Sequence, residues 1–252
     1  LGARVTHAVR TDGGLCSEPF GTYEVTVTMP DGRNQVLEAD AVLNATGRVP
    51  NTRGLALEKA AVAMHRDGSV AVNEWLQTSN PNVYAAGDCL PGPNKFTHAA
   101  EWQARVAVRN ALLGERADAR ALLVPRATYT EPEVASVGAT EAQLRDAGAE
   151  FETYRREAAD VDRNRCDGVA GGLCLLHVSP RGQILGSTIV GPGAGDHISE
   201  VTLCMQHGLG AADLAGTMHP YPTAAEVVRQ AAQAFVRSRI FQPQTQRILH
   251  QL

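Results

Sequence analysis

The stretch Met218-His219-Pro220-Tyr221-Pro222-Thr223-Ala224-Ala225-Glu226 joins a proline-rich loop to a helix near the end of the chain. Each proline fixes its own φ and restricts the residue before it, so we expect His219 and Tyr221 on a stiff loop. Thr223 is predicted to cap the following helix, with Glu226 three residues later completing a capping box. Two interpretations follow: a helix start with no further role, or a loop that presents side chains to a site.

Composition and charge exclude several classes of protein. The chain has 252 residues, 44% of them hydrophobic and 20% charged, which is enough for the core of one large or two modest domains. The formal net charge is -4 and no long run of Lys or Arg occurs, which argues against nucleic acid or an anionic membrane as the main partner. No apolar run approaches the length of a membrane span. The first residues lack a Met and the order of a signal peptide, so we expect a piece cut from a longer protein.

The cysteines indicate reduced thiols in a cytoplasmic protein. They are Cys16, Cys89, Cys166, Cys174 and Cys204, an odd number without a close pair. This spacing favours neither a disulfide framework nor a zinc site, so no metal site is predicted. Each thiol is interpreted as a small buried apolar group.

The first half of the chain mixes antiparallel strands with one helix. Residues 23–28 alternate at period two, residues 30–32 form a turn, and residues 35–38 return as the partner strand. Buried strands are predicted for residues 41–45 and 83–86, and a short strand pair near residues 70–72.

The second of these buried strands stops at Gly87 and Asp88. A carboxylate at such a strand end lies where α/β folds bind ligands, although a solvated turn is the alternative. Residues 96–113 are predicted to form a helix rich in small residues, with His98 near its start.

The second half of the chain is predicted to be an α+β domain with a mostly antiparallel sheet, after a linker at residues 114–125. The predicted strands are residues 126–130, 134–138, 172–178 and 183–190, and the predicted helices are residues 140–147, 196–207 and 224–238. Thr140 is the expected N-cap of the first of these helices.

Segments in the chain carry a resemblance. They are Ala45-Thr46-Gly47-Arg48-Val49-Pro50-Asn51, Thr78-Ser79-Asn80-Pro81-Asn82-Val83-Tyr84-Ala85-Ala86-Gly87-Asp88, Tyr129-Thr130-Glu131-Pro132-Glu133-Val134-Ala135-Ser136-Val137-Gly138, Gly191-Pro192-Gly193-Ala194-Gly195 and the stretch from Met218 to Glu226. Their order resembles that of the class I pyridine nucleotide-disulfide oxidoreductases, in particular mercuric reductase-like and dihydrolipoamide dehydrogenase-like members. The resemblance covers the C-terminal half of such a protein.

This resemblance implies a domain layout and cofactors. Residues 1–48 would be the tail of an NAD(P)-binding domain, residues 49–120 the returning segment of an FAD-binding domain, and residues 124–252 a dimerisation domain. The fold class is then an α+β dimerisation domain preceded by C-terminal parts of α/β domains. The cofactors implied for the full-length protein are FAD and NAD(P)H, and the implied partner is a second copy of the chain.

The resemblance also assigns site residues. Asp88 matches the family's aspartate that binds the ribityl chain of FAD, and a carboxylate can accept bonds from two hydroxyl groups. The cofactor-binding residues expected on this basis are Thr46, Gly47, Arg48, Gly87, Asp88, Phe96, Thr97 and His98.

The stretch from Met218 to Glu226 departs from the family pattern at one position. Members that reduce disulfides resemble His-x-His-Pro-Thr-x-x-Glu, in which the second His exchanges protons and the Glu orients it. Tyr221 takes the place of that His, while Glu226 is retained. A Tyr with a pKa near 10 mainly donates at neutral pH, so thiol-disulfide exchange is in doubt. Tyr221, Glu226 and His219 are the catalytic candidates, with His219 expected to point elsewhere.

The electron acceptor stays open between small molecules and metal ions. Mercuric reductases resemble this chain in carrying a tyrosine at this place, but they usually end in a Cys-Cys pair, whereas residues 246–252 contain no Cys. Two interpretations remain: a portion of an FAD-dependent NAD(P)H oxidoreductase, or a dimerisation module with no activity of its own.

Overall fold

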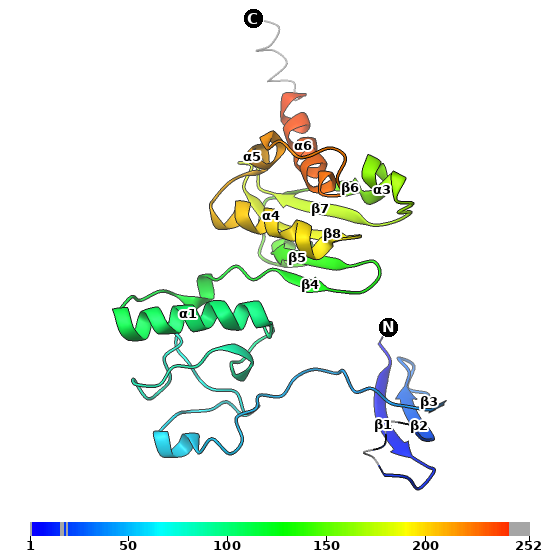
Figure 1. Ribbon diagram of the computed structural model, residues 1–252, viewed down its shortest axis with the longest axis vertical. Coiled ribbons are helices and arrows are strands. Elements are labelled where there is room, and N and C mark those ends of the chain that lie inside the picture. The colour runs from blue at the N-terminus through cyan, green and yellow to red at the C-terminus, as the bar shows by residue number, and fades with distance from the viewer. Residues whose placement is uncertain (1, 16–17, 19, 242–252) are drawn as a thin grey trace, which may run out of the picture. The chain divides into compact units, whose positions relative to one another are not determined.

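The computed structural model describes residues 2–15, 18 and 20–241. The predictions made for Cys16 and for residues 246–252 lie outside these residues. By its internal contacts the chain divides into two units, Leu1–Asn51 and Thr52–Leu252. Figure 1 colours both units by residue number, from blue at the N-terminus to red near the C-terminus. Within the described ranges, none of the helices combines the length and the apolar character that crossing a bilayer requires.

The first unit is a three-stranded antiparallel sheet in the order β1-β2-β3. Its strands are β1 (Arg4–Arg10), β2 (Tyr23–Thr28) and β3 (Asn34–Ala39). The predicted hairpin is confirmed, because Tyr23 pairs with Ala39 and Thr28 with Asn34. Gly32 has a φ of 82° in the connecting turn, a conformation that glycine adopts without strain.

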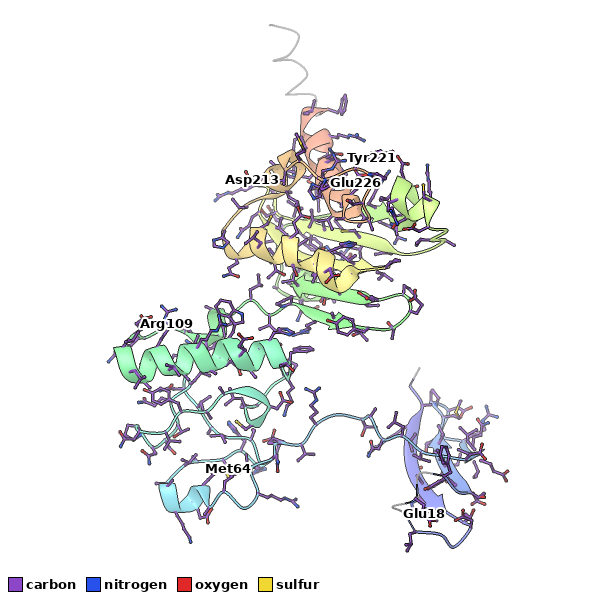
Figure 2. The ribbon with its side chains drawn as sticks, in the orientation of Figure 1. Glu18, Met64, Arg109, Asp213, Tyr221 and Glu226 are labelled. Atoms are coloured by element: carbon purple, nitrogen blue, oxygen red, sulfur yellow. The ribbon has the colours of Figure 1, made fainter. Side chains whose placement is uncertain are left out.

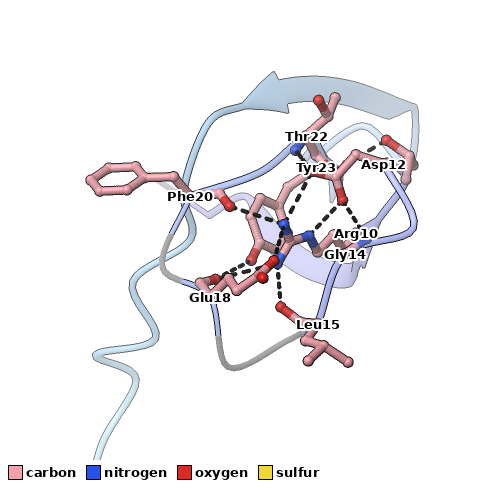
Figure 3. Close-up of polar contacts among 9 residues, drawn as sticks. Arg10, Asp12, Gly14, Leu15, Glu18, Phe20, Thr22 and Tyr23 are labelled. Atoms are coloured by element: carbon pink, nitrogen blue, oxygen red, sulfur yellow. Dashed lines mark hydrogen bonds and ion pairs between the residues drawn. The ribbon is translucent and has the colours of Figure 1, made fainter.

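Arg10, at the end of β1, holds the connection to β2 together (Figure 3). Its guanidinium pairs with the carboxylates of Asp12 and Glu18 and donates to the backbone oxygens of Leu15 and Phe20. The hydrogen bond between Arg10 and Asp12 raises the pKa of Arg10 and lowers the pKa of Asp12. A single buried side chain therefore satisfies backbone oxygens that strand pairing leaves open.

The buried strand predicted for residues 41–45 is wrong. These residues form no strand and are exposed, Leu43 by 91%. A strand needs a neighbour for its backbone groups, and the described residues of this unit place no strand beside the segment. An apolar run was therefore insufficient evidence for a strand.

The first part of the second unit, residues 52–122, consists of loops packed on one long helix. α1 (Thr97–Leu113) confirms the predicted helix, and Phe96 stands at its N-cap. A small core forms between the loops and α1, made of Leu76, Leu90, Val106 and Ala107.

Short elements replace the strands predicted in these loops. The 3-10 helices are η1 (Leu57–Ala60), η2 (Gly87–Cys89) and η3 (Ala119–Ala121). The strands predicted near residues 70–72 and 83–86 are reduced to isolated bridges, Met64 with Val70 and Gln77 with Tyr84. Tight turns at residues 65–68 and 80–83 bring the chain back on itself, so neither bridge extends into a ladder.

The remainder of the second unit is built on a five-stranded antiparallel sheet in the order β4-β5-β8-β7-β6. Its strands are β4 (Arg126–Thr128), β5 (Val134–Gly138), β6 (Glu152–Glu157), β7 (Leu173–Val178) and β8 (Ile184–Val190). The sequence predicts all of these strands except β6. Because helices cover the sheet, the predicted α+β class is confirmed for this part of the chain.

Helices pack against this sheet and enclose the main core (Figure 1). α4 (Ala194–Gln206) contacts β4, β5 and β8, and α6 (Glu226–Ile240) contacts β6 and β7. The core includes Leu176, Ile189, Ile198, Val201, Val228 and Phe235. The shorter helices are α2 (Glu141–Asp146), α3 (Asp162–Cys166) and α5 (Ala211–Gly216). Thr140 is the N-cap of α2, as predicted, and the structure adds a capping box with Gln143.

Candidate functional site

The candidate site is the loop of residues 217–225, which connects α5 to α6 and is called the 217–225 loop below. Thr223 does not cap α6 as predicted, because the N-cap is Ala225 and no described side chain caps this helix. The Thr223 hydroxyl instead donates to the backbone oxygen of Pro220 at 2.9 Å. The capping box is therefore wrong, and Thr223 tightens the loop itself.

His219 fastens the loop to α4. Its Nε2 lies 2.8 Å from Glu200 Oε1, and its Nδ1 lies 3.0 Å from the backbone oxygen of Thr217. The side chain is only 6% exposed. Both ring nitrogens face hydrogen-bond acceptors, which tie the ring to α4 and to the backbone of the loop. His219 points into the domain, as expected, and away from the solvent that Tyr221 meets.

Tyr221 is an exposed side chain of the loop, with 69% of its surface open to solvent. Its hydroxyl donates to Asp162 Oδ2 at 2.8 Å, and Asp162 is the first residue of α3. This hydrogen bond, and then the charge of Asp162, raise the pKa of Tyr221 above its usual value of 10. The phenol therefore stays protonated near neutral pH, and its proton is directed at Asp162.

Glu226, the first residue of α6, is buried at 4% exposure. Its carboxylate accepts a hydrogen bond from Arg229 Nη2, one turn further along the helix. Figure 2 shows Tyr221 and Glu226 beside α6. The two catalytic candidates thus have different hydrogen-bond partners, Asp162 and Arg229, and the expected Tyr-Glu dyad stays a prediction.

The expected cofactor residues of the second unit gather around the start of α1. Asp88 lies in η2, and its backbone oxygen accepts from Lys95 Nζ at 3.1 Å. Gly87 has a φ of 84°, and a Cβ there would lie 3.1 Å from the Cβ of Ala100 on α1. The absence of a side chain at Gly87 therefore lets η2 pack closely against α1.

Phe96 and His98 flank the first residue of α1, Thr97. The rings of Phe96 and His98 stack at 5.3 Å, and His98 Nε2 lies 2.8 Å from the backbone oxygen of Pro125. Among the described residues, no side chain caps α1. The first backbone N–H groups of this helix are thus not claimed by a cap and suit an anionic or polar ligand.

The remaining expected cofactor residues, Thr46, Gly47 and Arg48, lie in the first unit. All are exposed, and the Thr46 hydroxyl donates to Asn44 Oδ1 at 2.7 Å. Gly47 has a φ of 133°, which favours glycine. Their role in binding a cofactor stays a prediction.

The sequence did not reveal Asp162, Arg229 or Glu200 as partners of the candidate residues. Asp162 stands 59 residues before Tyr221, and α3 was not predicted at all. Arg229 carried a usable signal, because an Arg three residues after a Glu on a helix is positioned to pair with it.

The chain matches models of a known protein family over most of its length. Residues 1–104 match the model of the pyridine nucleotide-disulphide oxidoreductases, and residues 124–232 match the dimerisation domain of the same family.

Curated relatives and solved structures show the same likeness. Mercuric reductase of Staphylococcus aureus is 40% identical over 206 residues, which are 81% of this chain and 38% of that protein. Dihydrolipoyl dehydrogenase of Bacillus subtilis is 36% identical over 232 residues, 90% of this chain and 48% of that protein. The structure of LpdA from Mycobacterium tuberculosis is similar with a TM-score of 0.79 and 28% identity, covering 92% of this chain and 48% of that one. The flavoprotein disulfide reductase RclA from Escherichia coli is similar with a TM-score of 0.74 and 28% identity, over 83% of this chain and 48% of that one.

The chain thus spans less than half the length of these relatives. The matched segments nevertheless include the start of α1, the whole of the 217–225 loop and Glu226. On the strength of both family models and of these relatives, the chain belongs to the pyridine nucleotide-disulphide oxidoreductase family.

Proposed function

We propose that this chain is the FAD-segment and dimerisation portion of an FAD-dependent oxidoreductase that passes electrons from NAD(P)H through the flavin to an acceptor. The observation that carries the proposal is the 217–225 loop. It buries His219, leads into the buried Glu226 at the start of α6, and leaves the Tyr221 ring open to solvent. A loop with a buried anchor and an exposed polar ring is typical of a loop that contributes a side chain to a binding or catalytic site.

The residues around α1 fit the binding of FAD. The start of α1 offers backbone donors without a side-chain cap among the described residues, and Gly87 brings η2 close to that helix. Asp88 would accept hydrogen bonds from hydroxyl groups of the cofactor, and Phe96, Thr97 and His98 would lie along its edge. We also propose that Thr46, Gly47 and Arg48 take part in cofactor binding. Bound FAD supplies the redox chemistry, and these residues bind and orient it.

The acceptor site is proposed to form across a homodimer. The model of the dimerisation domain covers residues 124–232, which include Tyr221 and Glu226. In this arrangement Tyr221 of one chain would face the redox site of the other. The acceptor would be a small molecule or a metal ion, and we propose a cytoplasmic location for the protein.

The experiment that tests this proposal uses the full-length gene product. We expect the purified protein to carry bound FAD and to oxidise NADH or NADPH in the presence of mercuric ion, a quinone, a disulfide or oxygen. The absence of flavin from that protein would refute the proposal.

The second candidate function is a dimerisation module without activity. It is favoured by the match of residues 124–232 to a dimerisation domain and by exposed apolar side chains such as Met218, which is 94% exposed. Light scattering of the 252-residue chain separates the candidates. An inactive dimer supports the module, and a monomer that oxidises NAD(P)H contradicts it.

A further inference from the structure

We propose that Asp162 is a positioning residue for Tyr221. It fixes the orientation of the phenol and holds its proton, so that the phenolic oxygen meets an incoming ligand as a hydrogen-bond acceptor. The inference rests on the proposed function only in assuming that Tyr221 lies at the acceptor site. The contact itself is a property of the chain, since the Tyr221 hydroxyl lies 2.8 Å from Asp162 Oδ2.

The position of Asp162 is fixed on both sides by the core. Val161, directly before it, is completely buried. Asn164, two residues after it, is buried and donates from Nδ2 to the backbone oxygen of Ala158 at 2.9 Å. The other oxygen of the Asp162 carboxylate lies 4.0 Å from Arg165 Nη1. The carboxylate is therefore held by buried neighbours although it stands at the surface.

The position of Tyr221 is equally restricted. Pro220 and Pro222 fix the backbone on either side of it, and the buried pair of His219 and Glu200 fastens the loop to α4. A hydrogen bond between two such rigid groups costs little conformational entropy, so it persists despite the exposure of the ring.

The polarity of this contact determines what Tyr221 can do. A phenol has a single O–H group and two acceptor lone pairs, and its proton is directed at Asp162. The negative groups that face it are Asp162, Glu226 and Cys166 when ionised, and all of them disfavour a phenolate. Tyr221 therefore offers lone pairs to a ligand, which differs from the donor role that the sequence suggested.

The test is a spectrophotometric titration of the tyrosines in the 252-residue chain. The difference between the wild-type curve and that of Tyr221→Phe isolates the ionisation of Tyr221. We expect Asp162→Asn to shift this ionisation to lower pH, because the carboxylate charge is removed while the size of the side chain is kept. The matched control is Asp167→Asn, which removes a neighbouring carboxylate that pairs with Arg163.

An unchanged Tyr221 ionisation in Asp162→Asn would overturn the proposal, because a purely structural Asp162 would leave the phenol unaffected. An equal shift in Asp167→Asn would do the same, since it would trace the effect to general surface charge. If Asp162→Asn does not fold, Asp162→Ser provides the same test, because it also removes the carboxylate charge. The titration needs no flavin, so its failure is distinct from a failure of the proposed function.

Discussion

Replacing Arg229 by Met should destabilise the second unit strongly, because it leaves Glu226 buried without its partner. The Glu226 side chain is 5% exposed and the Arg229 side chain 24% exposed. Removing one partner of a buried ion pair costs about 3–5 kcal/mol. The start of α6 offsets about 1 kcal/mol of this cost, because a helix N-terminus favours a carboxylate. We therefore expect a loss of about 2–4 kcal/mol in the free energy of unfolding.

The matched control is Arg145→Met on α2. Arg145 pairs with Glu141 one turn earlier at 2.5 Å, but these side chains are 69% and 43% exposed. An exposed pair of this kind contributes little to stability, because water and salt screen it. Both substitutions remove an Arg that pairs with a Glu one helical turn earlier, at spacing i,i+3 for Arg229 and i,i+4 for Arg145. The large difference between the pairs is burial.

The assay is urea unfolding followed by the helical circular dichroism signal at a fixed protein concentration. All described helices lie in the second unit, so this signal reports on its unfolding. With a slope of about 2–3 kcal/mol per M, Arg229→Met should lower the midpoint by roughly 1 M and Arg145→Met by far less. The double variant Glu226→Met with Arg229→Met should recover part of the loss. Equal losses in the two single variants would refute the assignment of a buried ion pair.

Further predictions concern stability against pH, backbone strain and activity. Burial lowers the pKa of His177 below its usual value of 6.5, so the unfolded chain takes up the proton at a higher pH than the folded chain does. The free energy of unfolding should therefore fall as the pH drops below about 6.5. His177→Asn should make this fall shallower in urea titrations at several pH values. Gly138→Ala should be more destabilising than Gly148→Ala by thermal unfolding, because both have positive φ but only at Gly138 would a Cβ lie 2.5 Å from the oxygen of Leu185. In the full-length protein, Tyr221→His should raise turnover with lipoamide by less than the factor of about 10²–10⁴ typical of a complete acid-base group, and no gain at all would contradict the family correspondence at this position.

The sequence predicts elements well where the signal is local. The hairpin of β2 and β3 and the N-cap of α2 at Thr140 both depend on residues close together in the sequence, and both are confirmed. The strand β6 was missed because its sequence, residues 152–157, is mostly charged and only Tyr154 is buried. Its strand conformation comes from pairing with β7, a contact between distant residues that no local pattern contains.

The candidate site shows the same division. Proline spacing predicts a stiff loop, and the burial of His219 agrees with the expectation that it points elsewhere. The hydrogen-bond partner of Tyr221 depends on α3, which reaches the loop only through the folding of the whole domain. The residue pattern of the loop therefore pointed to Tyr221 and Glu226, but it could not reveal their hydrogen-bond partners, Asp162 and Arg229.

These contacts explain why a single substitution should restore a proton-exchanging pair in this loop only in part. The Tyr221 hydroxyl is directed at Asp162, and the Glu226 carboxylate is directed at Arg229 inside the domain. A histidine at position 221 would meet a Glu226 whose charge is already balanced by Arg229. Rebuilding the pair would require both the exchange of Tyr221 and the release of Glu226 from a buried ion pair, and that release costs about 2–4 kcal/mol by the same reasoning as for Arg229→Met. Tyr221 and Glu226 thus belong to two separate contacts, one with Asp162 and the other with Arg229.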